Sequence, residues 1–91
     1  MNKQITITVK LFGEWREYSQ DAEVSLKLPI NADVATLKQT FIKSLNQELI
    51  SDNSTALLNS SVFANESEVL SSAAQFTQDQ MLTIWPPVCG G

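Results

Sequence analysis

The 91-residue chain contains no histidine and only one cysteine. Without histidine, neither a Cys-His nor a Ser-His catalytic pair can form within the chain. One cysteine cannot make an internal disulfide, which favours a reducing compartment. A zinc site would have to be built from carboxylates and a single thiolate, so we expect no metal centre.

Basic residues are also few, since six Lys and Arg stand against ten Asp and Glu, for a net charge of −4. Phosphate binding needs clustered basic side chains, and here they are scattered, so we expect no nucleic-acid partner. No apolar stretch approaches the ~18 residues of a membrane span, and residues 1–6 hold no apolar run of signal-peptide length. We therefore expect a soluble, cytoplasmic protein with no membrane contact. Its acidity fits either solubility or a basic groove on a protein partner.

The first half of the chain predicts a hairpin followed by a helix. Alternating apolar and polar residues predict strands over 5–11 and 24–28, with a break at Gly13 and an end at Pro29. Asp33 is the predicted N-cap of a helix. Apolar residues then recur at spacings of three and four, which gives that helix one stripe to lay on a sheet: Val34, Leu37, Phe41 and Leu45.

The second half predicts mainly short strands. Residues 51–55 are polar and are expected to form a loop, 61–65 a short strand and turn, 69–70 a brief edge strand, and 81–85 the last strand. Trp15 and Tyr18 are placed in a loop, where core cover and partner contact are both open. The phenylalanines are expected in the core: Phe12, Phe41, Phe63 and Phe76.

This order of elements predicts an α+β fold. A helix between a hairpin and later strands can cover one face of a mixed sheet, and the last strand can then pair in parallel with the first. That is the β-grasp (ubiquitin-like) arrangement, with a mixed sheet packed on one main helix. We expect it to span residues 1–85 as a single domain, followed by a flexible tail over 86–91.

The tail has a composition suited to acyl chemistry. Pro86 and Pro87 fix φ and lack amide donors, so the chain leaves the sheet in an extended path of about 20 Å over six residues. Gly90 and Gly91 have no Cβ and can pass a channel too narrow for side chains. Attack of the terminal carboxylate on ATP would give an acyl adenylate, from which sulfur could displace AMP. A Gly-Gly end by itself is also what an inert terminus looks like.

The ending Ile-Trp-Pro-Pro-Val-Cys-Gly-Gly over 84–91 resembles the small subunit of molybdopterin synthase, the MoaD-like ubiquitin-fold sulfur carriers. The segments 9–13, with Arg16-Glu17 after them, and 33–38 are similar too. Two features depart from that family. The turn before the last strand is Gln-Asp-Gln rather than Asp-Gly-Asp, although Asp79 can adopt the left-handed conformation, and segment 50–60 is longer and richer in Ser and Asn.

The resemblance implies that Gly91 is adenylated by an activating enzyme of the ubiquitin-activating type and then thiocarboxylated. ATP would be consumed by that enzyme, and this chain would bind no cofactor and would not be catalytic alone. The tail would enter the large subunit of molybdopterin synthase, where its sulfur would pass to precursor Z. The residues implied in partner binding are Trp85, Pro86, Pro87, Val88 and Gly90.

Other functions stay open at this point. A sulfur carrier for another pathway or a ubiquitin-like protein modifier would use the same fold, although the Pro-Pro pair disfavours the thiazole carriers. A non-covalent β-grasp interaction module with an inert tail is a third possibility. Cys89 could capture an activated carboxylate, but the favoured interpretation is that it fills the family's variable small-residue position.

Overall fold

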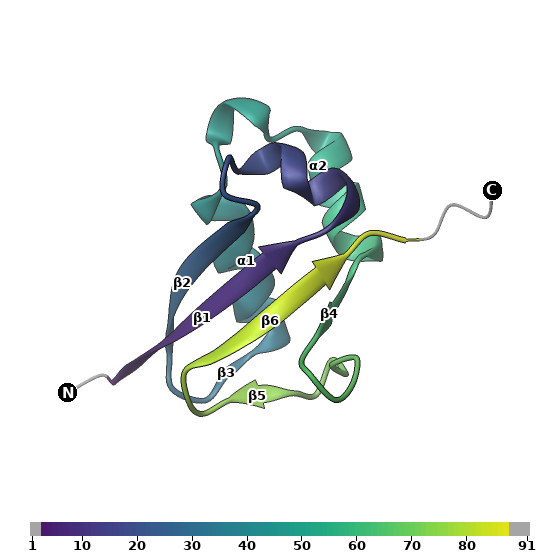
Figure 1. Cartoon of the computed structure of the whole chain (residues 1–91). Coiled ribbons are helices and arrows are strands. Elements are labelled where there is room, and N and C mark those ends of the chain that lie inside the picture. Colours follow the sequence, from purple (N-terminus) through teal and green to yellow (C-terminus); the bar gives the residue numbers. More distant parts are fainter. Residues whose placement is uncertain (1–2, 88–91) are drawn as a thin grey trace.

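The computed structural model describes residues 3–87, and it confirms the predicted mixed sheet. Strands β1 (Gln4–Leu11) and β2 (Glu23–Pro29) form an antiparallel hairpin. Strand β6 (Gln80–Trp85) pairs in parallel with β1, and β4 (Val62–Ala64) pairs antiparallel with β6. The sheet order is therefore β2-β1-β6-β4, with the first and last strands at its centre (Figure 1).

Strand β1 shows why these residues form the middle of the sheet. Its odd-numbered residues from Ile5 to Leu11 are buried, and the even-numbered ones point to the other face. Val9 is in register with Val24 on one side and with Leu82 on the other. A strand with neighbours on both sides and β-branched residues on its buried face fits a half-buried central position.

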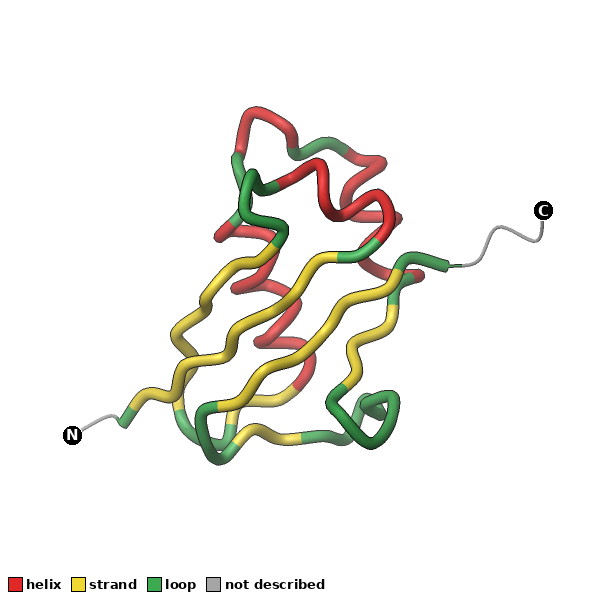
Figure 2. Tube along the Cα trace, in the orientation of Figure 1, coloured by secondary structure: helices red, strands yellow, loops and turns green. Residues whose placement is uncertain are grey.

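Helix α1 (Val34–Ser44) covers one face of this sheet, and no helix within residues 3–87 lies over the opposite face (Figures 1 and 2). Asp33 caps the helix as predicted, because its Oδ1 accepts a hydrogen bond from the amide of Thr36 at 2.9 Å. Leu37 and Phe41 are fully buried, which confirms the predicted stripe. The stripe packs into the same core as the buried residues of the strands, and burial of this shared core stabilises the domain.

The predicted loop at 51–55 is wrong, because helix α2 (Asp52–Ser60) begins there. Ser54 lies in the first turn, and its hydroxyl accepts a hydrogen bond from the amide of Ser51 at 3.1 Å. Polar residues in a first turn satisfy amides that have no partner within the helix, so a run of Ser, Asp and Asn can start a helix as well as fill a loop. The fold therefore carries a second helix beside α1.

The loop predicted around Trp15 is a 3₁₀ helix, η1 (Gly13–Tyr18). Trp15 is completely buried, so of its two open roles the structure shows core cover. Its indole N–H donates to Ser61 Oγ at 2.9 Å, and Tyr18 Oη shares a hydrogen bond of 2.8 Å with Ser54 Oγ. Within residues 3–87, every buried side-chain nitrogen or oxygen has a hydrogen-bond partner. These bonds fix η1 against α2.

Smaller elements complete the fold. Strands β3 (Ala32–Asp33) and β5 (Gln75–Phe76) form a second, two-stranded sheet that the sequence did not predict. A short 3₁₀ helix, η2 (Gln47–Leu49), lies between the two α-helices in the sequence. The predicted edge strand at 69–70 is reduced to one bridge between Val69 and Ala64.

The turn before β6 has no glycine and does not need one. Asp79 is absent from the positive-φ residues of the described chain, so the left-handed conformation that it could adopt is not used. Its Oδ1 instead accepts a hydrogen bond from the amide of Thr6 at 2.7 Å. That bond joins the start of β6 to β1 where the parallel pairing begins.

A prediction follows from Ala22, which has a φ of 55° and whose carbonyl accepts from the amide of Leu11 at 2.8 Å. The left-handed conformation costs a residue with a Cβ about 1–2 kcal/mol, and glycine avoids this cost. Part of the gain is offset because glycine gives the unfolded chain more conformational entropy. We expect Ala22→Gly to raise the unfolding free energy by about 0.5–1 kcal/mol, measured by urea denaturation. The control Ala56→Gly, at an exposed site in α2, should lower it by about 1 kcal/mol. Destabilisation by both would contradict the interpretation.

A second prediction concerns the cap of α1. Hydrogen bonds from the amide and hydroxyl of Thr36 lower the pKa of Asp33 below its ordinary value of 3.8. A lowered pKa stabilises the folded state above the ordinary value, and this contribution is lost as the pH falls through the folded pKa. The stability difference between wild type and Asp33→Asn should therefore shrink as urea denaturation is moved from neutral pH to below 3.8. A difference that is constant with pH would count against the charge-assisted cap.

Candidate functional site

The residues singled out from the sequence follow the end of β6. Trp85 is the last residue of that strand, and Pro86 and Pro87 continue outside any helix or strand. The remaining predicted site residues, Val88, Gly90 and Gly91, lie outside the described part of the chain, and so does Cys89. The structure therefore describes the base of the tail, meaning residues 85–87, and leaves the reactive terminus as a prediction.

Phe12 lies outside the core, and the core position predicted for it is wrong. Its ring stacks on the indole of Trp85 with centroids 4.1 Å apart and planes 10° from parallel. The cause is strand alternation: β1 buries its odd-numbered residues, so the next even-numbered position points to the uncovered face. In β6 the same alternation buries Leu82 and Ile84 and sends Trp85 outward. Since the two strands are parallel neighbours, both rings lie at the same end of the sheet.

Trp85 is held in orientation by a hydrogen bond as well as by the stack. Its indole N–H donates a hydrogen bond to Thr83 Oγ1 at 2.9 Å. The Thr83 hydroxyl in turn donates to the carbonyl oxygen of Ala64 at 3.4 Å. The side chain is still 45% exposed, and its cross-strand neighbour Val62 is 43% exposed. The base of the tail therefore offers an apolar surface to a partner.

Pro86 lies directly on the backbone of Gly13. A Cβ added to Gly13 would be 2.5 Å from Pro86 Cγ, which is too close for any side chain. Gly13 also has a φ of +60°, a conformation that favours glycine. The close approach and the backbone conformation both require glycine at this position. From the sequence, Gly13 was expected to end the first strand and to belong to the family-like segment 9–13, and its contact with Pro86 was not foreseen.

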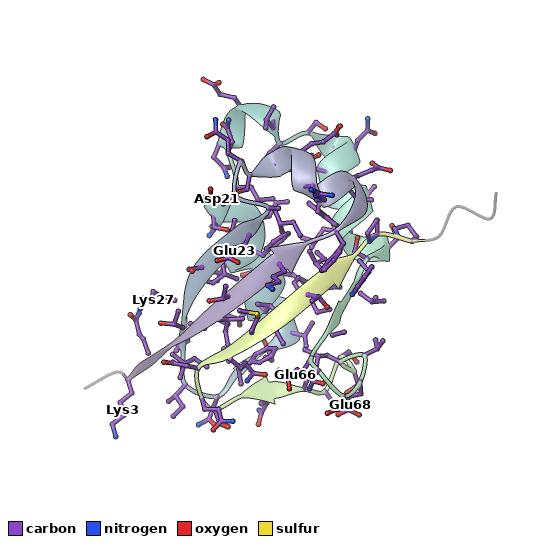
Figure 3. The ribbon with its side chains drawn as sticks, in the orientation of Figure 1. Lys3, Asp21, Glu23, Lys27, Glu66 and Glu68 are labelled. Carbon is purple, nitrogen blue, oxygen red and sulfur yellow. The ribbon has the colours of Figure 1, made fainter. Side chains whose placement is uncertain are left out.

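Four of the six labelled charged side chains in Figure 3 lie away from this end of the molecule, whereas Asp21 and Glu23 lie at the end of the sheet where β1 finishes. Lys3 and Lys27 lie near the start of β1, and Glu66 and Glu68 lie on the loop after β4 (Figure 3). Residues 3–87 bring no three potential metal ligands together, and none of the helices in that range is long and apolar enough to cross a bilayer. Aromatic, proline and glycine contacts thus hold the base of the tail, and charged residues line the hollow beside Phe12: Lys10, Arg16, Asp21 and Glu23.

Comparison with solved structures finds the same architecture in three proteins of near-equal length. SAMP1 from Haloferax volcanii matches with a TM-score of 0.69 at 18% identity, over 94% of this chain and 99% of that one. A protein assigned as molybdopterin converting factor, subunit 1, from Pyrococcus furiosus matches with a TM-score of 0.68 at 18% identity, over 92% and 99%. Small archaeal modifier protein 1 from Methanosarcina acetivorans matches with a TM-score of 0.63 at 19% identity, over 98% and 99%.

The chain has the ubiquitin-like β-grasp fold. The sequence resemblance to MoaD-like ubiquitin-fold proteins is thereby confirmed at the level of the fold. No protein-family model matches the chain, and no curated protein sequence is significantly similar to it.

The contact between Gly13 and Pro86 gives a third prediction. Gly13→Ala forces a side chain into the positive-φ conformation and displaces the Pro86 ring, so we expect a loss of about 1–2 kcal/mol of unfolding free energy. Urea denaturation measures this loss. The control Glu14→Ala changes the next, exposed residue and should stay within about 0.5 kcal/mol of wild type. Equal stabilities of the two variants would show that the glycine is not required.

Proposed function

We propose that the chain is a sulfur carrier whose C-terminal Gly91 is adenylated and then thiocarboxylated. The observation that carries the proposal is the junction of fold and tail. The central strand β6 of a β-grasp sheet ends at Trp85 and continues directly into Pro-Pro-Val-Cys-Gly-Gly. Fold likeness to SAMP1 and to a molybdopterin converting factor subunit supports a ubiquitin-fold carrier or modifier.

The chemistry needs no side chain of this protein. A carboxylate oxygen of Gly91 attacks the α-phosphorus of ATP, the bond to the β-phosphate breaks, and pyrophosphate leaves. Hydrosulfide then attacks the acyl carbon of the adenylate, AMP leaves, and one proton is released. The product is a thiocarboxylate, which is nucleophilic at sulfur. An activating enzyme of the ubiquitin-activating type would bind ATP and supply the acid, base and phosphate contacts for both steps.

We assign the carrier to molybdopterin synthesis in the cytoplasm. The support is the sequence resemblance of the tail together with the Pyrococcus furiosus neighbour, whose name describes one subunit of a converting factor. In this assignment a large subunit receives the tail and the sulfur passes to precursor Z. Trp85 and Val62 would pack on the partner. The residues assigned to the tail's path within it are Pro86, Pro87, Val88 and Gly90.

A ubiquitin-like modifier is the second candidate, and the two small archaeal modifier proteins favour it. It starts from the same adenylate, but the acyl group is transferred to a lysine amine of another protein. Expression of the tagged chain in its host distinguishes the two, since isopeptide-linked conjugates ending in Gly91 would support the modifier. A non-covalent module would require neither Gly91 nor ATP.

A fourth prediction tests the carrier directly. Incubation with ATP, sulfide and a ubiquitin-activating-type enzyme should replace one oxygen by sulfur in the intact protein, and fragment-ion spectra should place the sulfur on Gly91. Cys89→Ser should gain the same mass, because the neighbouring thiol is not the acceptor. Deletion of Gly91 should abolish the gain. An unchanged mass in wild type with an enzyme that does adenylate it, or sulfur found on Cys89, would contradict the proposed function.

A further inference from the structure

Two consecutive residues of the β1–η1 junction hold two consecutive residues at the base of the tail. The ring of Phe12 stacks on Trp85 at 4.1 Å, and Gly13 provides the flat backbone on which the Pro86 ring lies. These contacts join positions more than seventy residues apart in the chain, and the parallel pairing of β1 with β6 brings them together.

The junction is itself immobilised from the other side. η1 starts at Gly13, and the burial of Trp15 and its hydrogen bond to Ser61 attach that short helix to the end of α2. Ser61 Oγ in turn donates a hydrogen bond to the carbonyl oxygen of Leu57 in α2 at 2.6 Å. A continuous series of packed and hydrogen-bonded groups therefore runs from α2 through η1 to Pro86.

We propose that Phe12 and Gly13 are positioning residues that clamp residues 85–86 and so fix the direction in which the tail leaves the sheet. The inference rests on the proposed function, because a fixed direction matters only if the terminus must enter another protein. Pro87 follows Pro86, and a Pro-Pro pair is stiff, so an orientation set at Trp85 is carried forward along the chain.

The expected consequence of losing the clamp is a change in recognition rather than in chemistry. If only a fraction of the free molecules presents the tail correctly, the apparent dissociation constant for the partner rises by the inverse of that fraction. One stacked aromatic pair favours its ordered state by roughly three- to tenfold. Removing the Phe12 ring should therefore raise KM for the carrier by about three- to tenfold, with kcat retained.

The free protein is tested first, by NMR of the two tryptophan indole N–H groups. In Phe12→Ala the Trp85 indole signal should lose its ring-current shift and show faster local motion, while the buried Trp15 signal reports in the same spectrum that the domain is folded. Phe12→Tyr keeps a ring on Trp85 and should restore the wild-type signal. Ile30→Ala removes an exposed apolar side chain at the turn after β2 and serves as the control.

The same four proteins are then assayed with the activating enzyme, ATP and sulfide. Raised KM with unchanged kcat for Phe12→Ala, and wild-type values for Phe12→Tyr and Ile30→Ala, support the clamp. An unaltered Trp85 signal in Phe12→Ala, or a mobile Trp85 with an unchanged KM, overturns it. If wild type is never thiocarboxylated, the proposed function fails, and the NMR comparison alone then decides whether Phe12 holds the base of the tail.

Discussion

The parallel pairing of β1 with β6 is the constraint on which the rest of the molecule depends. It places Val9 between Val24 and Leu82 and so builds the buried centre of the sheet from three separate strands. It also places the C-terminal ends of both strands at the same end of the sheet. Because the two strands finish side by side, Phe12 and Gly13 after β1 support Trp85 and Pro86 at the end of β6. The candidate site therefore follows directly from the sheet topology.

The helical layer serves this arrangement in two ways. Helix α1 covers the buried face through Leu37 and Phe41, and the rings of Phe41 and Phe63 meet edge-on with centroids 5.6 Å apart. Ser54 in α2 and Ser61, the residue just after it, satisfy the polar groups of Tyr18 and Trp15. A buried polar network in which every member has a partner favours one arrangement of its parts. Here it orders the 3₁₀ helix that supports the base of the tail.

Most of the architecture could be predicted from the sequence because its main elements carry clear periodicity. The alternation in 5–11 and the spacing of Leu37 and Phe41 indicated the correct elements, and Asp33 was correctly identified as a cap. Helix α2 was missed because its first turn, Asp-Asn-Ser-Thr, is equally typical of a loop. The small β3–β5 sheet was missed because two-residue strands have no period to detect.

The candidate site was only partly predictable. Pro86 and Pro87 were singled out from the composition of the tail and Trp85 from the family resemblance, but Phe12 was assigned to the core, where the structure does not place it. Its position follows from the alternation of the strand. β1 buries its odd-numbered residues, so the even-numbered residue that follows the strand points to the other face. Neither Phe12 nor Gly13 could have been connected to the tail without the register of β6 on β1, which is a long-range property.

The order of synthesis gives the central pairing a further meaning. β1 is made before β6 and the other described elements lie between them in the sequence, so the middle of the sheet stays open until β6 has been made. Contacts between such distant segments form late in folding, because the loop between them must first be closed. A chain that stops before β6 lacks both the central strand and the support for the tail. Completion of the sheet and support of residues 85–86 are therefore one event in folding.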